Sequence, residues 1–365
     1  MIPFISFDYT NKLLREKFLY KTAEVIDSKN YVLGNEVNQF EEDFAKSLSI
    51  NYAIGVGNGL DALIISLKAL DIKVGDEVIV PSNTYIASWL AVSQVGATIV
   101  PVEPDIQTYN IDPKKIEEKI NPKTKAIMPV HLYGQASDMK SIMDIANKYN
   151  LYVIEDNAQA QLASWSGRYT GTFGHINATS FYPTKNLGAF GEAGCITTDS
   201  EKLMKFCKTY RNYGSEKKYI NSLKGVNSRL DELQAGYLNV KFKLLEKFTK
   251  QRRELAAYYF NNLSGIENLI LPHQDEKSYS VFHLYVLQTA KRDELQTHLN
   301  KNGIGTSIHY PIPPHLQEAY SNLGYKKGDF PIAEKLANSL LSIPLYPGLK
   351  KSEQEFIIDS IRQFF

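Results

Sequence analysis

The chain has 365 residues, with 41 basic and 40 acidic side chains and a formal net charge of +1. This length predicts about two domains, and the even charge balance argues against a nucleic-acid polymer as a partner. The 2 cysteines, Cys195 and Cys207, are too few for a disulfide framework and fit a reducing compartment. The longest apolar stretch, residues 89–102, is shorter than the roughly 20 residues of a membrane span, and the N-terminus has no signal-peptide pattern. We therefore expect a cytoplasmic protein that does not bind a membrane.

Short apolar runs alternate with helical patterns through the first 200 residues. This alternation is typical of an α/β fold with a mainly parallel sheet. Helices are predicted over Leu60–Leu70, where leucine and isoleucine recur with helical spacing, and over Asp138–Tyr149. The predicted strands are Tyr52–Val56, Glu77–Pro81, Thr98–Val102, Ala126–Val130, Leu151–Glu155 and Gly194–Thr197.

The second part of the chain has a different pattern. Two residues, Ser352 and Glu355, have the spacing of a capping box before a last helix. We place a domain boundary near residue 245, which gives a large α/β domain, 1–245, and a smaller α+β domain, 246–365. The elements predicted before that last helix are the helices Arg229–Lys250, Gln251–Leu263 and Asp293–Asn302 and the strands Val281–Gln288 and, approximately, Gly305–His309.

Two carboxylates follow the fifth predicted strand. Four largely apolar residues lead directly into Glu155 and Asp156, which places Asp156 at the carboxyl end of a buried strand. Open α/β sheets bind their ligands at that edge, and a buried carboxylate needs a partner because an unpaired charge is costly to bury. Taken alone, Asp156 is better explained as an ordinary strand-end cap.

A lysine in an unusual setting follows about thirty residues later. Lys185 is surrounded by turn-forming, aromatic and hydroxyl residues rather than by an alternating charged face: the segment reads Ser-Phe-Tyr-Pro-Thr-Lys-Asn-Leu-Gly over residues 180–188. A lysine that forms a Schiff base needs a confined pocket that lowers its pKa. The setting of Lys185 fits that requirement.

Glycines lead from the first predicted strand into the helix at Leu60. Backbone amides at a helix N-terminus bind phosphate, but the spacing of Gly55, Gly57 and Gly59 matches neither a nucleoside-triphosphate loop nor a dinucleotide motif. Alone, the run is typical of a tight turn. Together with Asp156 and Lys185 it supplies what pyridoxal phosphate requires, namely a phosphate anchor, a partner for the ring nitrogen and an amine.

Longer blocks of sequence identify a family. Residues 155–160 (Glu-Asp-Asn-Ala-Gln-Ala), 180–188 and 227–235 (Asn-Ser-Arg-Leu-Asp-Glu-Leu-Gln-Ala) resemble the DegT/StrS sugar aminotransferases, and the resemblance runs from Phe4 to the C-terminus. Residues 81–85, 215–219 and 309–317 are most similar to dTDP-3-oxo-6-deoxyhexose aminotransferases of the QdtB and FdtB type. The resemblance implies the aspartate-aminotransferase fold, pyridoxal 5′-phosphate (pyridoxamine phosphate in its aminated form) as cofactor, no metal, and a homodimer with shared active sites.

The resemblance also implies a role for each matching residue. Lys185 and Asp156 are the implied catalytic residues, one holding the cofactor as a Schiff base and the other facing its ring nitrogen. The implied cofactor contacts are Gly59, Leu60 and Ser180 at the phosphate, Gln159 at the ring hydroxyl, Tyr85 stacked on the ring, and Asn227 from a second subunit. The implied substrate contacts are Tyr182, Lys218, His309 and Tyr310 at the sugar, and Arg229 at the carboxylate of the amino donor.

Three positions depart from the family pattern. Leu60 replaces a common threonine, which removes one hydroxyl from the phosphate site, Asn157 replaces a small alanine, and Gln161 replaces a histidine. These departures affect the detailed geometry and leave the chemistry unchanged. Relatives that catalyse dehydration have histidine in place of the lysine, so Lys185 argues against that branch.

The resemblance implies transfer of an amino group from glutamate to carbon 3 of a dTDP-linked 3-oxo-6-deoxyhexose. The implied product is a dTDP-3-amino-3,6-dideoxyhexose, a precursor of O-antigen or S-layer glycans. Two alternatives stay open: an aminotransferase for a 4-oxo sugar, and a non-catalytic regulator that binds the cofactor. The configuration at carbon 4 and the identity of the nucleotide are not determined by the sequence.

Overall fold

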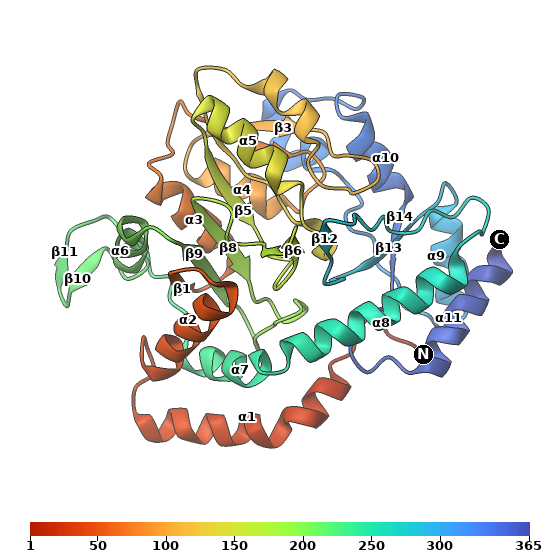
Figure 1. Ribbon diagram of the computed structural model, residues 1–365, viewed down its shortest axis with the longest axis horizontal. Helices are drawn as coiled ribbons and strands as arrows, with labels where there is room; N and C mark the ends of the chain where they lie inside the picture. Colours follow the sequence, from red (N-terminus) through yellow and green to blue (C-terminus); the bar gives the residue numbers. More distant parts are fainter.

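A seven-stranded mixed sheet lies at the centre of the computed structural model, which describes residues 1–365 (Figure 1). The strand order is β1-β9-β8-β5-β4-β2-β3. Only β9 runs antiparallel to its neighbours, so the other strands all end at the same edge of the sheet. The strands are β1 (Tyr52–Val56), β2 (Glu77–Pro81), β3 (Thr98–Val102), β4 (Thr124–Ile127), β5 (Tyr152–Asp156), β8 (Ile176–Ser180) and β9 (Gly194–Thr198).

Helices and three small sheets make up the rest of the fold. The α-helices are α1 (Asp8–Ser28), α2 (Asn35–Leu48), α3 (Gly59–Ala69), α4 (Ile86–Gln94), α5 (Met139–Tyr149), α6 (Glu201–Tyr210), α7 (Glu232–Phe242), α8 (Leu245–Leu263), α9 (Arg292–Lys301), α10 (Pro331–Ser339) and α11 (Lys351–Phe364). Short 3-10 turns lie at Pro113–Lys115, Glu117–Lys119, Leu132–Gly134, Pro314–Leu316 and Glu318–Leu323. The remaining strands are β6 (Ser164–Trp165), β7 (Arg168–Tyr169), β10 (Ser215–Lys217), β11 (Ile220–Asn221), β12 (Ser278–Tyr279), β13 (Tyr285–Gln288) and β14 (Leu340–Ile343).

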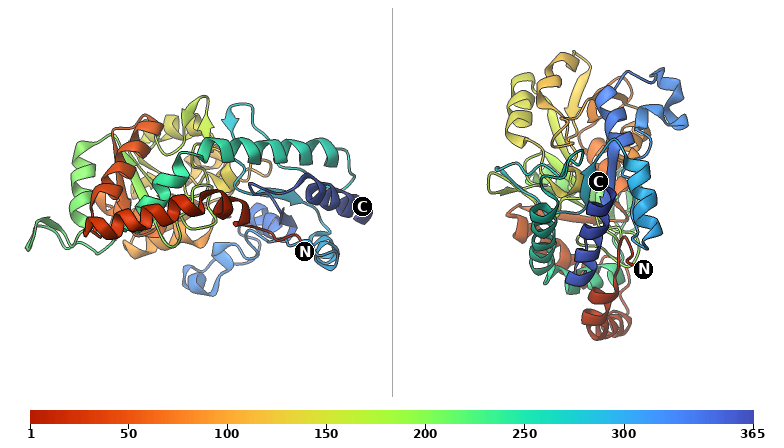
Figure 2. Two further views of the ribbon diagram at one scale, coloured as in Figure 1. Left: turned by 90° about the horizontal axis from the view of Figure 1, so that it is seen from below. Right: turned by 90° about the vertical axis from the view of Figure 1, so that its right-hand side faces the viewer.

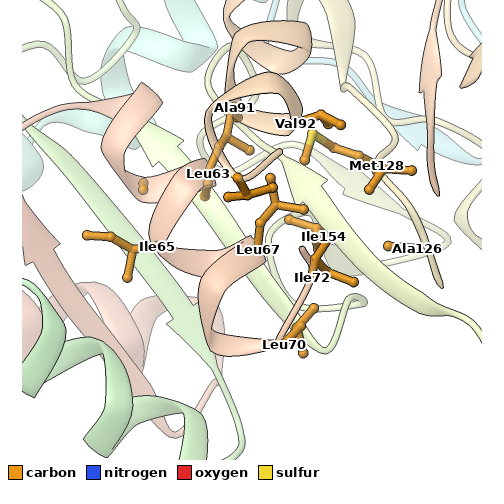
Figure 3. Packing of buried hydrophobic residues seen from close by; sticks show 14 of the residues in the cluster. Leu63, Ile65, Leu67, Leu70, Ile72, Ala91, Val92, Ala126, Met128 and Ile154 are labelled. Carbon is orange, nitrogen blue, oxygen red and sulfur yellow. The ribbon is translucent and has the colours of Figure 1, made fainter. Parts of the chain in front are cut away.

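The central sheet is covered by helices on both faces. Side chains alternate along a strand, so Val78 of β2 packs in the layer of α3 and α4, whereas the next residue, Ile79, packs with α5 on the opposite face. Figure 3 shows the first layer, where Leu63 and Leu67 of α3 lie near Ile154 of β5. Burial on both faces fixes the sheet and therefore the positions of the loops at its edge.

A second apolar cluster lies beyond the sheet, among α8, α9, α11 and the paired strands β13 and β14 (Figures 1 and 2). The rings of Tyr259 and Tyr285 lie 5.1 Å apart within it. Ile2 also belongs to this cluster, and its amide donates to the Gly303 carbonyl at 2.8 Å. We propose two domains with a boundary near residue 245, where α8 begins, and with the first residues packed on the second domain. No helix of the chain combines the length and the apolar character needed to cross a membrane.

Most predicted elements of the first part agree with the structure. Three predicted strands, β1, β2 and β3, are confirmed at both ends, and the other predicted elements before residue 200 are shifted by one to three residues. Strand β8 is absent from the prediction because Asn177 and Thr179 interrupt its apolar pattern. Both side chains are buried, and the Asn177 amide donates to the Gly171 carbonyl at 2.9 Å, so polar residues are tolerated inside this strand.

The predictions for the second part are less accurate. The predicted helix 229–250 is wrong: Leu244 leaves the helical conformation between α7 and α8, and α8 then continues past residue 250. The predicted strand at Gly305–His309 is also wrong, because only Ser307 forms a bridge, to Ser342 of β14. The capping box before α11 lies two residues earlier than predicted, with the Glu353 carboxylate accepting from the Lys350 amide at 3.0 Å.

Candidate active site

The sequence-predicted residues gather at the carboxyl edge of the parallel strands. Strand β1 runs into the N-terminus of α3, β5 ends at Asp156, β8 ends at Ser180, and β2 is followed by the turn that carries Tyr85. Ligands of open α/β sheets bind at this edge. The fold therefore brings together segments that are more than a hundred residues apart in the chain.

The N-terminus of α3 and Ser180 form an anion site. The Asn58 side chain caps the helix by accepting from the Asp61 amide at 2.8 Å, which leaves the amides of Gly59 and Leu60 without an acceptor inside the helix. A Cβ at Gly59 would lie 2.6 Å from the Ser180 Cβ, so only glycine allows this approach. Two free amides and a hydroxyl at a helix N-terminus suit a phosphate group.

Asp156 is a buried carboxylate with no cation bonded to it. Its Oδ2 accepts from the Ser88 hydroxyl at 2.9 Å, and its Oδ1 accepts from the Ala158 amide at 3.1 Å. Burial raises the pKa of Asp156, and the hydrogen bonds from Ser88 and Ala158 and the charge of Lys185 oppose the rise. A protonated ring nitrogen would supply the charge partner that this site lacks.

Lys185 lies in a tight turn that begins at the end of β8. Its amide donates to the Tyr182 carbonyl at 2.8 Å, and a Cβ at Gly188 would lie 2.2 Å from the Pro183 carbonyl oxygen, which requires glycine there. The Lys185 amine makes no hydrogen bond or ion pair within the protein. Burial lowers its pKa to about 8, although Asp156 opposes the shift. A partly deprotonated amine without a partner is suited to form a Schiff base.

A polar network links the end of β5 to residues 309 and 310 of the C-terminal part of the chain. The side-chain Nε2 of Gln159 donates to the Tyr310 hydroxyl at 3.0 Å, and its side-chain Oε1 accepts from the backbone amide of Tyr133 at 2.7 Å. The rings of Tyr85 and Tyr310 lie 5.1 Å apart, and the Tyr85 side chain is left half exposed above the site. Burial and Lys185 lower the pKa of His309 to about 4, so its imidazole is neutral.

Four other predicted side chains make no hydrogen bond to this group. Lys218 lies at the turn of the β10–β11 hairpin, which projects from the body of the protein, and its ammonium lies 5.2 Å from the Tyr219 ring centroid (Figures 1 and 2). The Asn227 amide donates to the Tyr213 hydroxyl at 2.8 Å, and Arg229 donates to Asn212 at 2.9 Å. Tyr182 is exposed on the turn before Lys185. The contacts predicted for these four side chains are not formed within one chain.

The structure adds residues that the sequence patterns did not indicate. Ser88 contacts Asp156, but a serine in an apolar helix gives no signal in sequence. His283 is buried, its Nδ1 lies 3.2 Å from the Asn186 Oδ1, and burial together with Lys185 lowers its pKa. It lies inside the predicted strand 281–288, where a histidine among apolar residues resembles core sequence, and the contact with Asn186 and the effect of Lys185 on its pKa connect it to the site.

These features fit pyridoxal phosphate. The anion site can hold the phosphate, the Asp156 carboxylate can face the ring nitrogen, and the Lys185 amine can reach an aldehyde group, with Tyr85 available to cover the ring. Asp156 has no bonded cation and the Lys185 amine has no hydrogen-bond partner, so both can bond to a ligand. The site thus has the donor, acceptor and amine that this cofactor needs.

The sequence matches the profile of the DegT/DnrJ/EryC1/StrS aminotransferase family over residues 12–362. The chain belongs to this family. Its relatives include the dTDP-3-amino-3,6-dideoxy-alpha-D-galactopyranose transaminase of Aneurinibacillus thermoaerophilus, which is 49% identical over 364 residues, with 100% of this chain and 99% of the relative covered. The DegT-family match confirms the resemblance that the sequence motifs indicated.

Solved structures of DegT-family proteins share the fold. S. venezuelae DesV, crystallised in complex with a ketimine intermediate, has a TM-score of 0.98 and 42% sequence identity, covering 100% of this chain and 98% of its own. NtdA from Bacillus subtilis, with bound pyridoxamine phosphate, has a TM-score of 0.92 and 34% identity, covering 99% and 84%. The protein is therefore an aminotransferase that uses pyridoxal phosphate, with the aspartate-aminotransferase fold.

Proposed function

We propose that this aminotransferase moves an amino group from glutamate to carbon 3 of a dTDP-linked 3-oxo-6-deoxyhexose. The observation that carries the proposal is the placement of Lys185 and Asp156 beside one phosphate-binding helix N-terminus, in a chain 49% identical to a dTDP-3-amino-dideoxyhexose transaminase. Burial raises the pKa of Asp156 and lowers the pKa of Lys185, and perturbed pKa values of this kind are typical of functional sites. The product would be a dTDP-3-amino-3,6-dideoxyhexose.

Each residue of the site has a separate role in the proposed reaction. When bound, pyridoxal phosphate supplies an aldehyde and a ring that accepts electrons. Asp156 holds the proton on the ring nitrogen. Lys185 Nζ takes the proton from the α-carbon of the amino donor and later delivers a proton to carbon 3 of the sugar. A pKa of about 8 suits this double task, because the amine exchanges protons readily near neutral pH.

The second domain supplies the sugar contacts in this proposal. His309 and Tyr310 adjoin Gln159 and Tyr85 at the mouth of the site, and the neutral His309 can accept or donate a hydrogen bond without adding charge. Tyr182 lies exposed on the same side. Arg229 would bind the carboxylate of glutamate, for which a guanidinium is well suited.

The remaining contacts would come from a second copy of the chain. The projecting hairpin that carries Lys218 also exposes Tyr219 and Ile220, and α1 exposes Leu13, Tyr20 and Ile26. Large apolar side chains that are exposed close together on one element often mark a surface that another protein covers. These surfaces support a homodimer in which Lys218 and Asn227 enter the active site of the partner.

Two other functions are compatible with parts of this site. A 4-oxo sugar would use the same cofactor residues, so the preference for carbon 3 rests on the motifs at 227–235 and 309–317 and on the relative at 49% identity. A regulator without activity is disfavoured because Lys185 and Asp156 are both present. Cys195 and Cys207 are free, buried thiols, which supports a reducing compartment such as the cytoplasm.

Addition of glutamate separates an active enzyme from a regulator that only binds cofactor. The holoenzyme, mixed with glutamate alone, should convert its bound pyridoxal phosphate to pyridoxamine phosphate, with a loss of visible absorbance and release of one oxo-acid per site. Absence of that conversion, with the cofactor still bound, would contradict the proposed activity.

A further inference from the structure

Two buried hydroxyl groups connect Asp156 to the turn before α4. The Ser88 Oγ donates to the Asp156 Oδ2 at 2.9 Å, and the Thr84 Oγ1 lies 3.1 Å from the Ser88 Oγ. Both hydroxyl-bearing residues are almost fully buried. The other carboxylate oxygen accepts from the Ala158 amide at 3.1 Å. Asp156 is therefore held at both oxygens by donors from two different elements.

The carboxylate determines which way the protons in this chain point. An ionised carboxylate only accepts hydrogen bonds, so Ser88 must donate to Asp156. The Ser88 oxygen is then free to accept, and Thr84 must donate to it. Hydrogen bonds in such a chain polarise one another and are strengthened by low dielectric surroundings. Both hydroxyl protons are thus directed toward the carboxylate.

We propose that Thr84 and Ser88 form a positioning relay that keeps the Asp156 carboxylate ionised and aimed at the ring nitrogen of the cofactor. The inference rests on the proposed role of Asp156. Thr84 and Ser88 act through Asp156 and need not touch the cofactor themselves. Because Thr84 directly precedes Tyr85, the relay also connects the residue that would cover the ring with the residue that faces its nitrogen.

The surroundings of Asp156 agree with a relay of this kind. Burial raises the pKa of the carboxyl group, and the hydrogen bond from Ser88 is the strongest of the influences that oppose the rise, ahead of Ala158, Lys185 and His131. Lys185 changes its bonding during the reaction, whereas Ser88 is fixed in a helix. The hydroxyl relay therefore supports the ionised carboxylate through every step.

The test measures binding of pyridoxamine phosphate, which does not bond covalently to Lys185. Apoprotein carrying Ser88→Ala is titrated with pyridoxamine phosphate between pH 5 and pH 9. Near pH 7 we expect binding about tenfold weaker than in wild type, equivalent to about 1.4 kcal/mol. As the pH is lowered, the variant should begin to lose binding about one pH unit above the pH at which wild type does. The matched control is Ser66→Ala, where an equally buried helical serine bonds only to the Ala62 carbonyl.

Two further variants and one analogue show whether the effect passes through the ring nitrogen. Thr84→Val keeps the shape and removes the second donor, so it should shift the acid limb in the same direction by a smaller amount, whereas Ser88→Thr keeps the donor and should restore binding. A 1-deaza analogue of pyridoxamine phosphate, with carbon in place of the ring nitrogen, should bind wild type and Ser88→Ala within about twofold of each other.

The outcomes separate the relay from the role of Asp156. If Asp156→Asn weakens binding while Ser88→Ala behaves like Ser66→Ala, the relay is overturned and the proposed role of Asp156 stands. If neither variant weakens binding, the assignment of Asp156 is overturned and the relay with it. A loss of affinity for the deaza analogue equal to that for pyridoxamine phosphate would also contradict the relay, because it would reveal general damage to the site.

Discussion

At the scale of single residues, burial of the Lys185 amine lowers the stability of the protein without its cofactor. Its amine is confined, has no hydrogen-bond partner, and has a pKa lowered to about 8 from an ordinary value of 10.5. Between about pH 8 and pH 10.5 the folded chain therefore holds this amine neutral, whereas the unfolded chain keeps it protonated. Functional sites often carry such a cost because the group gains its partner only from the ligand.

Replacement of this lysine by an apolar residue should stabilise the apoprotein. Between pH 8 and 10.5 the unfolded chain binds a proton at Lys185 that the folded chain has released, so stability rises with pH across that range. Lys185→Met should add about 2 kcal/mol to the free energy of unfolding at pH 7, allowing for partial exposure. The gain should disappear near pH 10.5. Urea unfolding at both pH values checks this, and an equal or lower stability at pH 7 would contradict it.

Removal of the same amine should abolish turnover without abolishing cofactor binding. Lys185→Ala should lower the rate constant at least about a thousandfold, since a positioned acid–base group contributes up to roughly 10⁴. Pyridoxamine phosphate should still bind, because the phosphate site and Asp156 are unchanged. Steady-state turnover within tenfold of wild type would exclude Lys185 as the group that transfers the proton.

At the scale of elements, the N-terminus of α3 depends on one glycine. The close approach of Gly59 to Ser180 leaves no room for a side chain. Gly59→Ala should separate the helix from β8 and weaken binding of pyridoxamine phosphate at least about tenfold. Gly191→Ala is the matched control, because its Cβ would meet nothing closer than 3.4 Å. Equal affinities in the two variants would contradict the phosphate site.

A second element depends on a buried carboxylate. Glu232, at the start of α7, accepts from the amides of Gly34, Glu36 and Val37 at 2.6, 3.0 and 3.1 Å and so caps α2 from a distant part of the chain. Glu232→Ala would leave buried amides unpaired and should lower the free energy of unfolding by about 3 kcal/mol. The exposed Glu246→Ala should change it by less than about 0.5 kcal/mol. Urea unfolding compares the two, and similar values would contradict the cap.

Elements whose burial shows in their apolar spacing can be predicted from sequence, and elements that depend on tertiary hydrogen bonds cannot. Strands such as β2 and helices such as α3 are predictable because their apolar spacing reflects burial directly. Strand β8 is not, because the Asn177 side-chain nitrogen donates to the Gly171 carbonyl, a tertiary contact that no local pattern records. The pairing of Ser307 with Ser342 likewise depends on a neighbour distant in sequence.

The same division applies to the site. The sequence alone indicates Lys185, Asp156 and the glycines, because each lies at a strand end or in a turn that a local pattern identifies. Ser88 and His283 cannot, since a buried serine in a helix and a histidine beside an apolar strand are both usual in protein cores. Their contacts with Asp156 and Asn186 arise only once the sheet has assembled.

At the scale of the whole molecule, the two groups of residues proposed to form one active site lie in separate parts of the chain. The sheet edge carries Lys185 and Asp156, while the hairpin with Lys218 extends away from it. A symmetric dimer would bring each hairpin to the sheet edge of the partner. The exposed apolar residues of α1 and of the hairpin supply surface for such an interface.

Complementation between two inactive variants tests this arrangement. Lys185→Ala and Lys218→Ala homodimers should each have low activity. After joint refolding, half of the dimers are mixed and each has one intact site, so activity should recover to about a quarter of wild type. Recovery should fail for Lys185→Ala mixed with Asp156→Asn, which affect the same half of the site. No recovery in the first mixture would contradict a shared active site.

The central claim is that the enzyme places an amine on carbon 3 of a nucleotide-linked oxo-sugar. The direct measurement supplies the holoenzyme with glutamate and, separately, with dTDP-3-oxo-6-deoxyhexoses and dTDP-4-oxo-6-deoxyhexoses of both configurations, and locates the new amine by NMR. We predict turnover of a 3-oxo substrate with nitrogen on carbon 3. Nitrogen only on carbon 4, or no transfer to any of these sugars by enzyme that has reacted with glutamate, would contradict the claim.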